Sequence, residues 1–297
     1  ISGLRIVYDP MYGCGLGYVD ELLREAGASV TIIHGERDPS FKGLTPEPIL
    51  PHLRDLVSEV RRQNADLGLA NDGDADRFGI VEFEPGFMHP NTVLPTIAWY
   101  LLEKRRLKGS IVRSIATTHL IDRIAWDYGV VVCETPVGFK WIAEFMVSGN
   151  VILGCEESGG LSIMGHIPDK DGIVACLLLA EIRGETCKRI NDIVEELWRE
   201  YGRRYYERMD IKMRVEQRDK VISELKQRII ETRRVNDLAV ENVVLMDGVK
   251  LVFSDESWIL VRPSGTEPLI RIYIEATSSR SLNIIREYVR EKIISNI

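Results

Sequence analysis

The 297-residue sequence lacks the features that mark several specialised classes of protein. Its five cysteines stand singly, without the paired spacing of a zinc site or the density of a disulfide framework. It contains no apolar run of about 18 residues, and its first residues lack the basic-then-apolar order of a signal peptide. We therefore expect reduced thiols, no membrane span and a cytoplasmic location.

An excess of basic residues is also missing. The chain carries 38 Lys and Arg against 45 Asp and Glu, for a net charge of -7. Proteins that bind nucleic acids normally present a basic face to the phosphates, so the composition argues against a nucleic-acid partner. A small anionic ligand is compatible with this charge, because a few local arginines can hold one phosphate.

The order of apolar runs predicts an α/β fold over the first two thirds of the chain. Strand-like runs alternate there with helical spacing, which requires a largely parallel sheet covered on both faces. The expected strands span 4–8, 29–33, 66–70, 78–83, 110–113, 130–133 and 151–153, and the expected helices span 18–26, 47–64, 91–105, 117–128, 139–147, 172–182 and 190–201.

A basic, polar stretch at 103–109 interrupts this pattern, and from about residue 203 consecutive strands are bracketed by two helices. We therefore expect two consecutive α/β/α three-layer domains, at 1–106 and 107–203, followed by a small α+β domain at 204–297.

An acidic loop lies between two of the expected strands. Asp72, Asp74 and Asp76 alternate within six residues, and three crowded carboxylates repel one another unless a cation is present. Oxygen-only ligands favour a hard cation such as Mg²⁺. A calcium EF-hand is excluded, because Arg77 stands where that loop needs glycine and Phe83 where it needs glutamate. An ordinary solvated acidic turn is the alternative.

An arginine-flanked loop near the C-terminus has the composition of a phosphate clamp. Arg262 precedes the turn Ser264-Gly265-Thr266, and Arg271 follows it. Successive backbone amides, two hydroxyls and guanidinium groups can together hold an anion. The alternative is a hairpin loop closed by prolines.

Three further loops carry candidate ligand-binding residues. Glu156 and Ser158 follow an apolar strand, at the edge where open α/β sheets bind ligands, and a flexible loop is the alternative. Lys140 also follows a strand and could face an anion or only water. His166 and Lys170 precede a helix, in a segment that could carry chemistry or simply cap the helix.

A glycine cluster after the first strand is similar to a dinucleotide-binding fingerprint. Gly13, Gly15 and Gly17 are followed by Glu36 about twenty residues on, but Tyr18 occupies the place of the third glycine. We interpret the cluster as a tight turn into the helix, with a nicotinamide-dependent dehydrogenase as a weak alternative.

Taken together and in this order, the loops resemble those of the α-D-phosphohexomutases, the phosphoglucomutases and phosphomannomutases. The resemblance covers essentially the whole chain and rests on DGDADR, GFK, EES, HIPDKDG and RPSGTEP. It implies that Asp72, Asp74 and Asp76 bind Mg²⁺, with Arg77 close to the transferring phosphoryl group. It also implies a general acid/base at Lys170 or His166, sugar recognition by Lys140, Glu156 and Ser158, and a distal phosphate held by Arg262, Ser264, Gly265, Thr266 and Arg271.

The implied activity interconverts a hexose 1-phosphate, of glucose or mannose, with its 6-phosphate through a 1,6-bisphosphate and a phosphoserine. Two departures from the family matter. Gly160 stands where many members have histidine, and no phosphoserine loop is found in the sequence. We expect that serine in an N-terminal domain preceding residue 1, without which this chain is inactive. A non-catalytic module that binds Mg²⁺ and sugar phosphate is the alternative.

Overall fold

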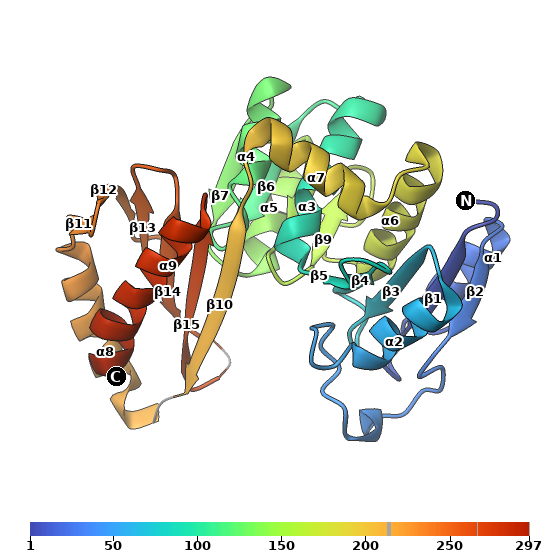
Figure 1. Cartoon of the computed structure of the whole chain (residues 1–297), viewed down its shortest axis with the longest axis horizontal. Helices are drawn as coiled ribbons and strands as arrows, with labels where there is room; N and C mark the ends of the chain where they lie inside the picture. Colours follow the sequence, from blue (N-terminus) through green and yellow to red (C-terminus); the bar gives the residue numbers. More distant parts are fainter. Residues whose placement is uncertain (213–214, 266, 297) are drawn as a thin grey trace. The chain divides into compact units, whose positions relative to one another are not determined.

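The computed structural model describes residues 1–212, 215–265 and 267–296 (Figure 1). The chain forms two compact units, residues 1–201 and residues 202–297. Two sheets lie in the first unit and one in the second. In the part of the chain that is described, no helix is both long and apolar enough to cross a bilayer.

The first sheet has the strand order β2-β1-β3-β4-β5, with β1 parallel to β2 and β3 and the last two strands antiparallel. Side chains alternate along β1, so Ile6 and Tyr8 face one helical layer and Val7 faces the other. The strands are β1 (Arg5–Asp9), β2 (Ser29–Ile32), β3 (Leu67–Asn71), β4 (Phe78–Val81) and β5 (Phe87–Met88), and helices α1 (Val19–Glu25) and α2 (Arg54–Gln63) cover opposite faces.

The second sheet repeats this arrangement with the order β7-β6-β8-β9. Its first three strands are parallel, and the last is antiparallel. The strands are β6 (Ser110–Ser114), β7 (Val132–Thr135), β8 (Val151–Cys155) and β9 (Leu161–Ile163), and the associated helices are α4 (Leu120–Asp127), α5 (Phe139–Ser148) and α7 (Ile190–Tyr201).

Two helices cross between the sheets. Helix α3 (Pro90–Trp99) follows the first sheet along the chain but packs against α4 and α7, and its last residues continue into the helical turn Tyr100–Lys104. Helix α6 (Gly172–Thr186) follows the second sheet but packs against β3, β4 and α1. One hydrophobic core therefore extends through both sheets. The proposed boundary at 106/107 falls inside this unit, and the three-domain division stays a prediction.

The second unit is a six-stranded antiparallel sheet with its own core. Its strands are β10 (Tyr205–Lys212), β11 (Arg234–Val235), β12 (Leu238–Val244), β13 (Val249–Phe253), β14 (Trp258–Pro263) and β15 (Leu269–Ala276), and its helices are α8 (Val215–Ile230) and α9 (Ser279–Tyr288), followed by turns Val289–Ile293 and Ile294–Asn296. The predicted fold class, two consecutive α/β/α three-layer domains followed by a small α+β domain, is confirmed.

Some element boundaries differ from the expectation. The helix predicted from residue 47 begins only at Arg54. The preceding segment contains Pro46, Pro48 and Pro51, which lack an N–H group and bias the residues before them towards extended backbone. Strands β5 and β9 are absent from the expectation, because two or three residues are too few for a periodic pattern.

Candidate active site

The sheet topology puts two of the predicted loops at equivalent places. Strands β1 and β6 are central in their sheets. Each pairs with the next strand along the chain on one side and with a later strand on the other, so the strand order reverses beside β1 and beside β6. Ligands bind outside the carboxyl ends of strands at such a reversal. Asp72 follows β3 directly, and Glu156 follows β8 directly, so each loop leaves its sheet at such an edge.

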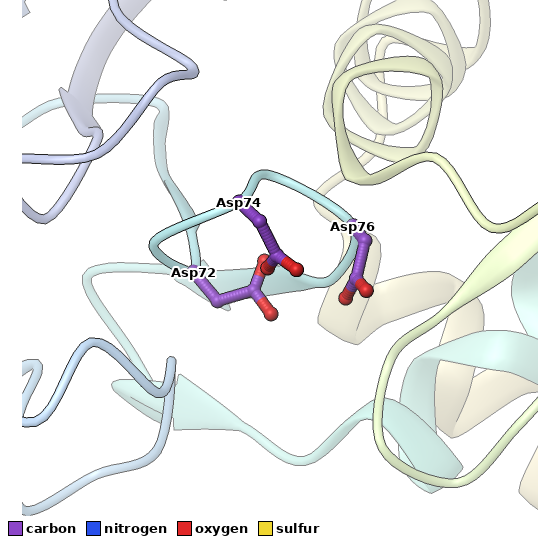
Figure 2. A group of neighbouring side chains, drawn as sticks. All are labelled: Asp72, Asp74 and Asp76. Carbon is purple, nitrogen blue, oxygen red and sulfur yellow. The ribbon is translucent and has the colours of Figure 1, made fainter.

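The acidic loop brings its three carboxylates together. One ligand oxygen from each of Asp72, Asp74 and Asp76 lies within 4.8 Å of the others. Figure 2 shows all three side chains turned to the same side of the loop. Burial, together with the charge of Asp76, raises the pKa of Asp72 to about 7. A nearby positive charge therefore favours the ionised form of Asp72.

The donor set fits a hard divalent cation. All three groups offer oxygen, which Mg²⁺ prefers. Among the described residues, Asp76 Oδ1 is a buried polar atom without a hydrogen-bond partner. The only cationic group of the loop itself is Arg77, whose Nε lies 3.6 Å from the carboxylates of both Asp72 and Asp76. Arg77 thus borders the same space as the carboxylates.

Residues of β1 and the following glycine turn hold the acidic loop. The Tyr8 hydroxyl donates to Asn71 Oδ1 at 2.9 Å, and Asn71 Nδ2 donates to the carbonyl of Arg77 at 2.8 Å, which closes the loop at its base. A Cβ added at Gly13 would lie 2.5 Å from the carbonyl oxygen of Gly73. The glycine turn therefore has a packing reason for its composition that does not involve a nucleotide.

Backbone hydrogen bonds tie three of the predicted loops together. The Phe78 N–H, just after the acidic loop, donates to the Gly159 carbonyl at 3.2 Å. The Gly172 N–H donates to the Ala75 carbonyl at 2.9 Å, and the Asp171 N–H donates to the Leu161 carbonyl at 2.8 Å. The acidic loop, the Glu156 loop and the Lys170 segment consequently form one assembly.

Glu156 joins a fourth loop to this assembly. Its carboxylate is buried and accepts a hydrogen bond from the Gly138 N–H at 2.7 Å, at the start of the turn that carries Lys140. Burial and the neighbouring Glu157 raise the pKa of Glu156 to about 7, while the charges of Lys170 and Arg77 oppose that rise. Glu156 is therefore electrostatically linked to the acidic loop.

The other predicted residues of the first unit differ in their surroundings. Lys170 forms an ion pair with Asp76. His166 instead hydrogen-bonds through Nε2 to Asp171 at 2.9 Å, and Asp171 also caps helix α6. Lys140 is exposed, with its ammonium 4.8 Å from the centre of the Trp141 ring. Ser158 is half-buried.

The sequence reasoning passed over two buried polar residues beside these loops. Glu157 accepts a hydrogen bond from Ser114 Oγ at 3.1 Å and raises the pKa of Glu156. Asn71 closes the acidic loop. Each lies next to a predicted residue in the sequence, and both are buried. The feature of the sequence that could have identified them is a polar residue at, or just after, the end of an apolar strand.

The predicted phosphate loop lies in the second unit, between β14 and β15. Arg262 and Arg271 are directly opposite each other in the antiparallel register. Opposite residues of such a pair lie on the same face of the sheet, where two like charges are unfavourable. Each is offset by a carboxylate: Arg262 Nε donates to Asp247 at 2.9 Å, and Arg271 Nη2 donates to Glu267 at 2.8 Å.

The turn between these arginines is partly buried. Ser264 is 1% exposed, and its hydroxyl accepts a hydrogen bond from the Glu267 N–H at 3.2 Å. Gly265 is exposed, and a Cβ added there would meet nothing within 4 Å. The predicted Thr266 lies outside the described residues.

Family models match most of the chain. Phosphoglucomutase/phosphomannomutase alpha/beta/alpha domain II matches residues 1–84, alpha/beta/alpha domain III matches 89–201, and the C-terminal domain matches 211–292. A phosphoglucomutase of Komagataeibacter xylinus and a phosphoglucomutase/phosphomannomutase of Thermococcus kodakarensis are each 32% identical, over 94% and 96% of this chain. A protein solved as a phosphomannomutase from Thermus thermophilus superposes with a TM-score of 0.83 over 98% of this chain, at 32% identity.

The relatives are longer than this chain. It covers 54% of the Komagataeibacter protein, 59% of the Thermococcus protein and 61% of the Thermus structure. A protein of Methanopyrus kandleri named as a phosphoglucosamine mutase, 31% identical over 96% of this chain, is covered to 60%. On the matches of all three family models, the chain belongs to the phosphoglucomutase/phosphomannomutase family.

Proposed function

We propose that the protein is a phosphohexomutase that interconverts the 1-phosphate and 6-phosphate of a hexose, glucose or mannose. The observation that carries the proposal is the assembly of the three-carboxylate loop with the Glu156 and Lys170 loops. Relatives named as phosphoglucomutase, phosphomannomutase and phosphoglucosamine mutase support the reaction class.

Asp72, Asp74 and Asp76 would hold Mg²⁺. A bound divalent cation offsets the charge that develops on a transferring phosphoryl group. Arg77 borders the same carboxylates and supplies a guanidinium to the phosphoryl oxygens. Because positioning and electrostatic stabilisation account for most of phosphoryl-transfer catalysis, this part of the site needs no nucleophile of its own.

Sugar hydroxyls would be recognised by Glu156 and Ser158, with Lys140 orienting the substrate. A buried carboxylate fixed by the Gly138 N–H is a well-positioned hydrogen-bond acceptor. Lys170 is the proposed general acid/base, since its ammonium pairs with Asp76, one of the proposed metal ligands. His166 is the second candidate for that role, and its bond to Asp171 would also orient the loop that carries Lys170.

The phosphate that does not react would be held in the second unit. Arg262 and Arg271 provide two guanidiniums on one face, Ser264 and Thr266 provide hydroxyls, and the exposed Gly265 provides a backbone amide. An anion between the arginines would relieve the repulsion of two like charges. A fixed grip on the distal phosphate raises the rate of in-line transfer at the other end of the sugar.

The phosphoryl donor in this proposal is a phosphoserine of a further domain, outside these 297 residues. It would phosphorylate the sugar 1-phosphate, and the resulting 1,6-bisphosphate would reorient and return its other phosphoryl group. The isolated chain would then bind substrate without turning it over.

A coupled assay tests the proposal. The full-length protein is incubated with glucose 1-phosphate, Mg²⁺ and a trace of glucose 1,6-bisphosphate, and release of glucose 6-phosphate is followed; mannose 1-phosphate and glucosamine 1-phosphate are assayed in parallel. Turnover of at least one sugar is expected. Binding of sugar phosphates without turnover of any of them, by a protein that contains the phosphoserine loop, would leave the non-catalytic module as the better account.

A further inference from the structure

Asp76 is paired with a basic residue from a distant part of the chain. Lys170 Nζ contacts Asp76 Oδ2, and the two side chains are only 24% and 21% exposed. Arg77 Nε lies 3.6 Å from the other oxygen of the same carboxylate. The carboxylate of Asp76 is thus neutralised from two sides by groups of the protein itself.

The backbone around Lys170 holds it in this place. Asp171 and Gly172, the next two residues, donate their N–H groups to Leu161 and to Ala75 of the acidic loop. The stem of Lys170 lies directly over Gly160, where an added Cβ would be 3.0 Å from Lys170 Cδ and 3.2 Å from its Cβ. A side chain at position 160 would therefore shift the stem of Lys170 by a few tenths of an ångström.

We propose that Lys170 is the internal counter-ion of the metal site, and that its ammonium competes with a divalent cation for the carboxylate of Asp76. Gly160 is then a positioning residue, since its missing side chain permits the contact. The inference rests on the proposed metal site of the mutase and adds that Lys170 competes with the metal for Asp76. The Lys170–Asp76 pair lowers the metal affinity that the three carboxylates would otherwise have.

The charge of Lys170 also acts on the proposed sugar site. Glu156 is the buried carboxylate whose ionised form the charge of Lys170 favours, and it belongs to the proposed sugar site. A divalent cation at Asp76 repels the ammonium of Lys170 and so weakens the Lys170–Asp76 pair. Metal binding and the placement of the proposed general acid/base are coupled in this way.

Metal binding to the 297-residue chain, without any turnover, tests this inference. Mn²⁺ replaces Mg²⁺ at oxygen-ligand sites, and free Mn²⁺ is measured by electron paramagnetic resonance with Mg²⁺ as the competitor. Lys170→Met keeps the apolar stem and removes the charge. It should tighten Mn²⁺ binding about fivefold to tenfold, because a half-shielded ion pair is stronger than a fully exposed one.

Two further variants separate the contact from bulk charge. Gly160→Ala keeps the lysine charge but shifts its stem by a few tenths of an ångström, so it should tighten Mn²⁺ binding less than Lys170→Met does, with the melting temperature of the chain as a check on folding. Lys108→Met removes the same unit charge from an exposed site and should change the affinity less than about twofold, by the effect of one screened surface charge.

Each outcome has a distinct reading. Unchanged or weaker Mn²⁺ binding by Lys170→Met, with clear binding by the unmodified chain, overturns the counter-ion role and leaves the metal site standing. Equal effects of Lys170→Met and Lys108→Met also overturn it, since bulk charge would then suffice. Absence of binding in every variant overturns the metal site itself. None of these results depends on mutase turnover, so failure of the proposed activity is recognised separately.

Discussion

The packing of helix α6 against the acidic loop makes Gly172 a sensitive position. A Cβ added there would lie 2.3 Å from the carbonyl oxygen of Arg77 and 2.5 Å from Asn71 Nδ2. Ordinary contacts are at least 3.4 Å, so the loop or the helix must move by about 1 Å to accept alanine. The backbone of Gly172 is helical, so no strain arises from its own dihedral angles.

Gly172→Ala should therefore destabilise the first unit through overpacking alone. Such insertions cost about 1–3 kcal/mol, which exceeds the gain in helix propensity of at most about 1 kcal/mol. A net loss of about 1–2 kcal/mol would lower the melting temperature of a 201-residue unit by about 2–8 °C. The displaced acidic loop should also bind Mn²⁺ more weakly.

Differential scanning calorimetry of the purified chain measures the first effect, and Mn²⁺ titration measures the second. Gly265→Ala is the matched control, since its added methyl would meet nothing within 4 Å and should leave the melting temperature unchanged. A melting temperature for Gly172→Ala within about 1 °C of the unmodified chain would refute the reasoning, because overpacking of a buried backbone contact cannot be that cheap.

Three other changes test the site and the fold. Asp74→Ala in the full-length protein should reduce kcat in the coupled assay by about 100-fold or more. The melting temperature should not fall, since Asp74 is exposed. Near-normal turnover in Mg²⁺ would contradict the role of Asp74 as a ligand. Arg262→Ala should chiefly raise KM, by about tenfold or more, because it removes a grip on the phosphate that does not react; a change in kcat alone would contradict this. The hydrogen bond that His34 Nδ1 donates to Asp9 raises the pKa of His34, so the stabilisation is complete below the ordinary pKa of about 6.5 and is lost as pH rises through the raised value. Urea unfolding should therefore show a larger loss of stability for His34→Ala at about pH 5.5 than at about pH 8.5, and the reverse order would contradict the sign.

Local sequence determined much of this protein. Alternating apolar runs of the two α/β layers predict their strands and helices, because burial on both faces leaves a pattern within each segment. The closeness of Asp72, Asp74 and Asp76 is also a local property, since a short loop between two adjacent strands cannot separate them. The resemblance to the family rests on such short segments, and the comparisons confirm it.

Only the tertiary structure decided how these segments meet. Three features join residues that no local pattern relates. Helices α3 and α6 each pack against the sheet or helices of the other α/β layer, Arg262 lies opposite Arg271, and Lys170 pairs with Asp76. Each depends on the order and register of strands, which are selected by the burial of whole faces. Sequence therefore identified the groups proposed to bind metal and phosphate, whereas packing determined which of those groups already neutralise one another.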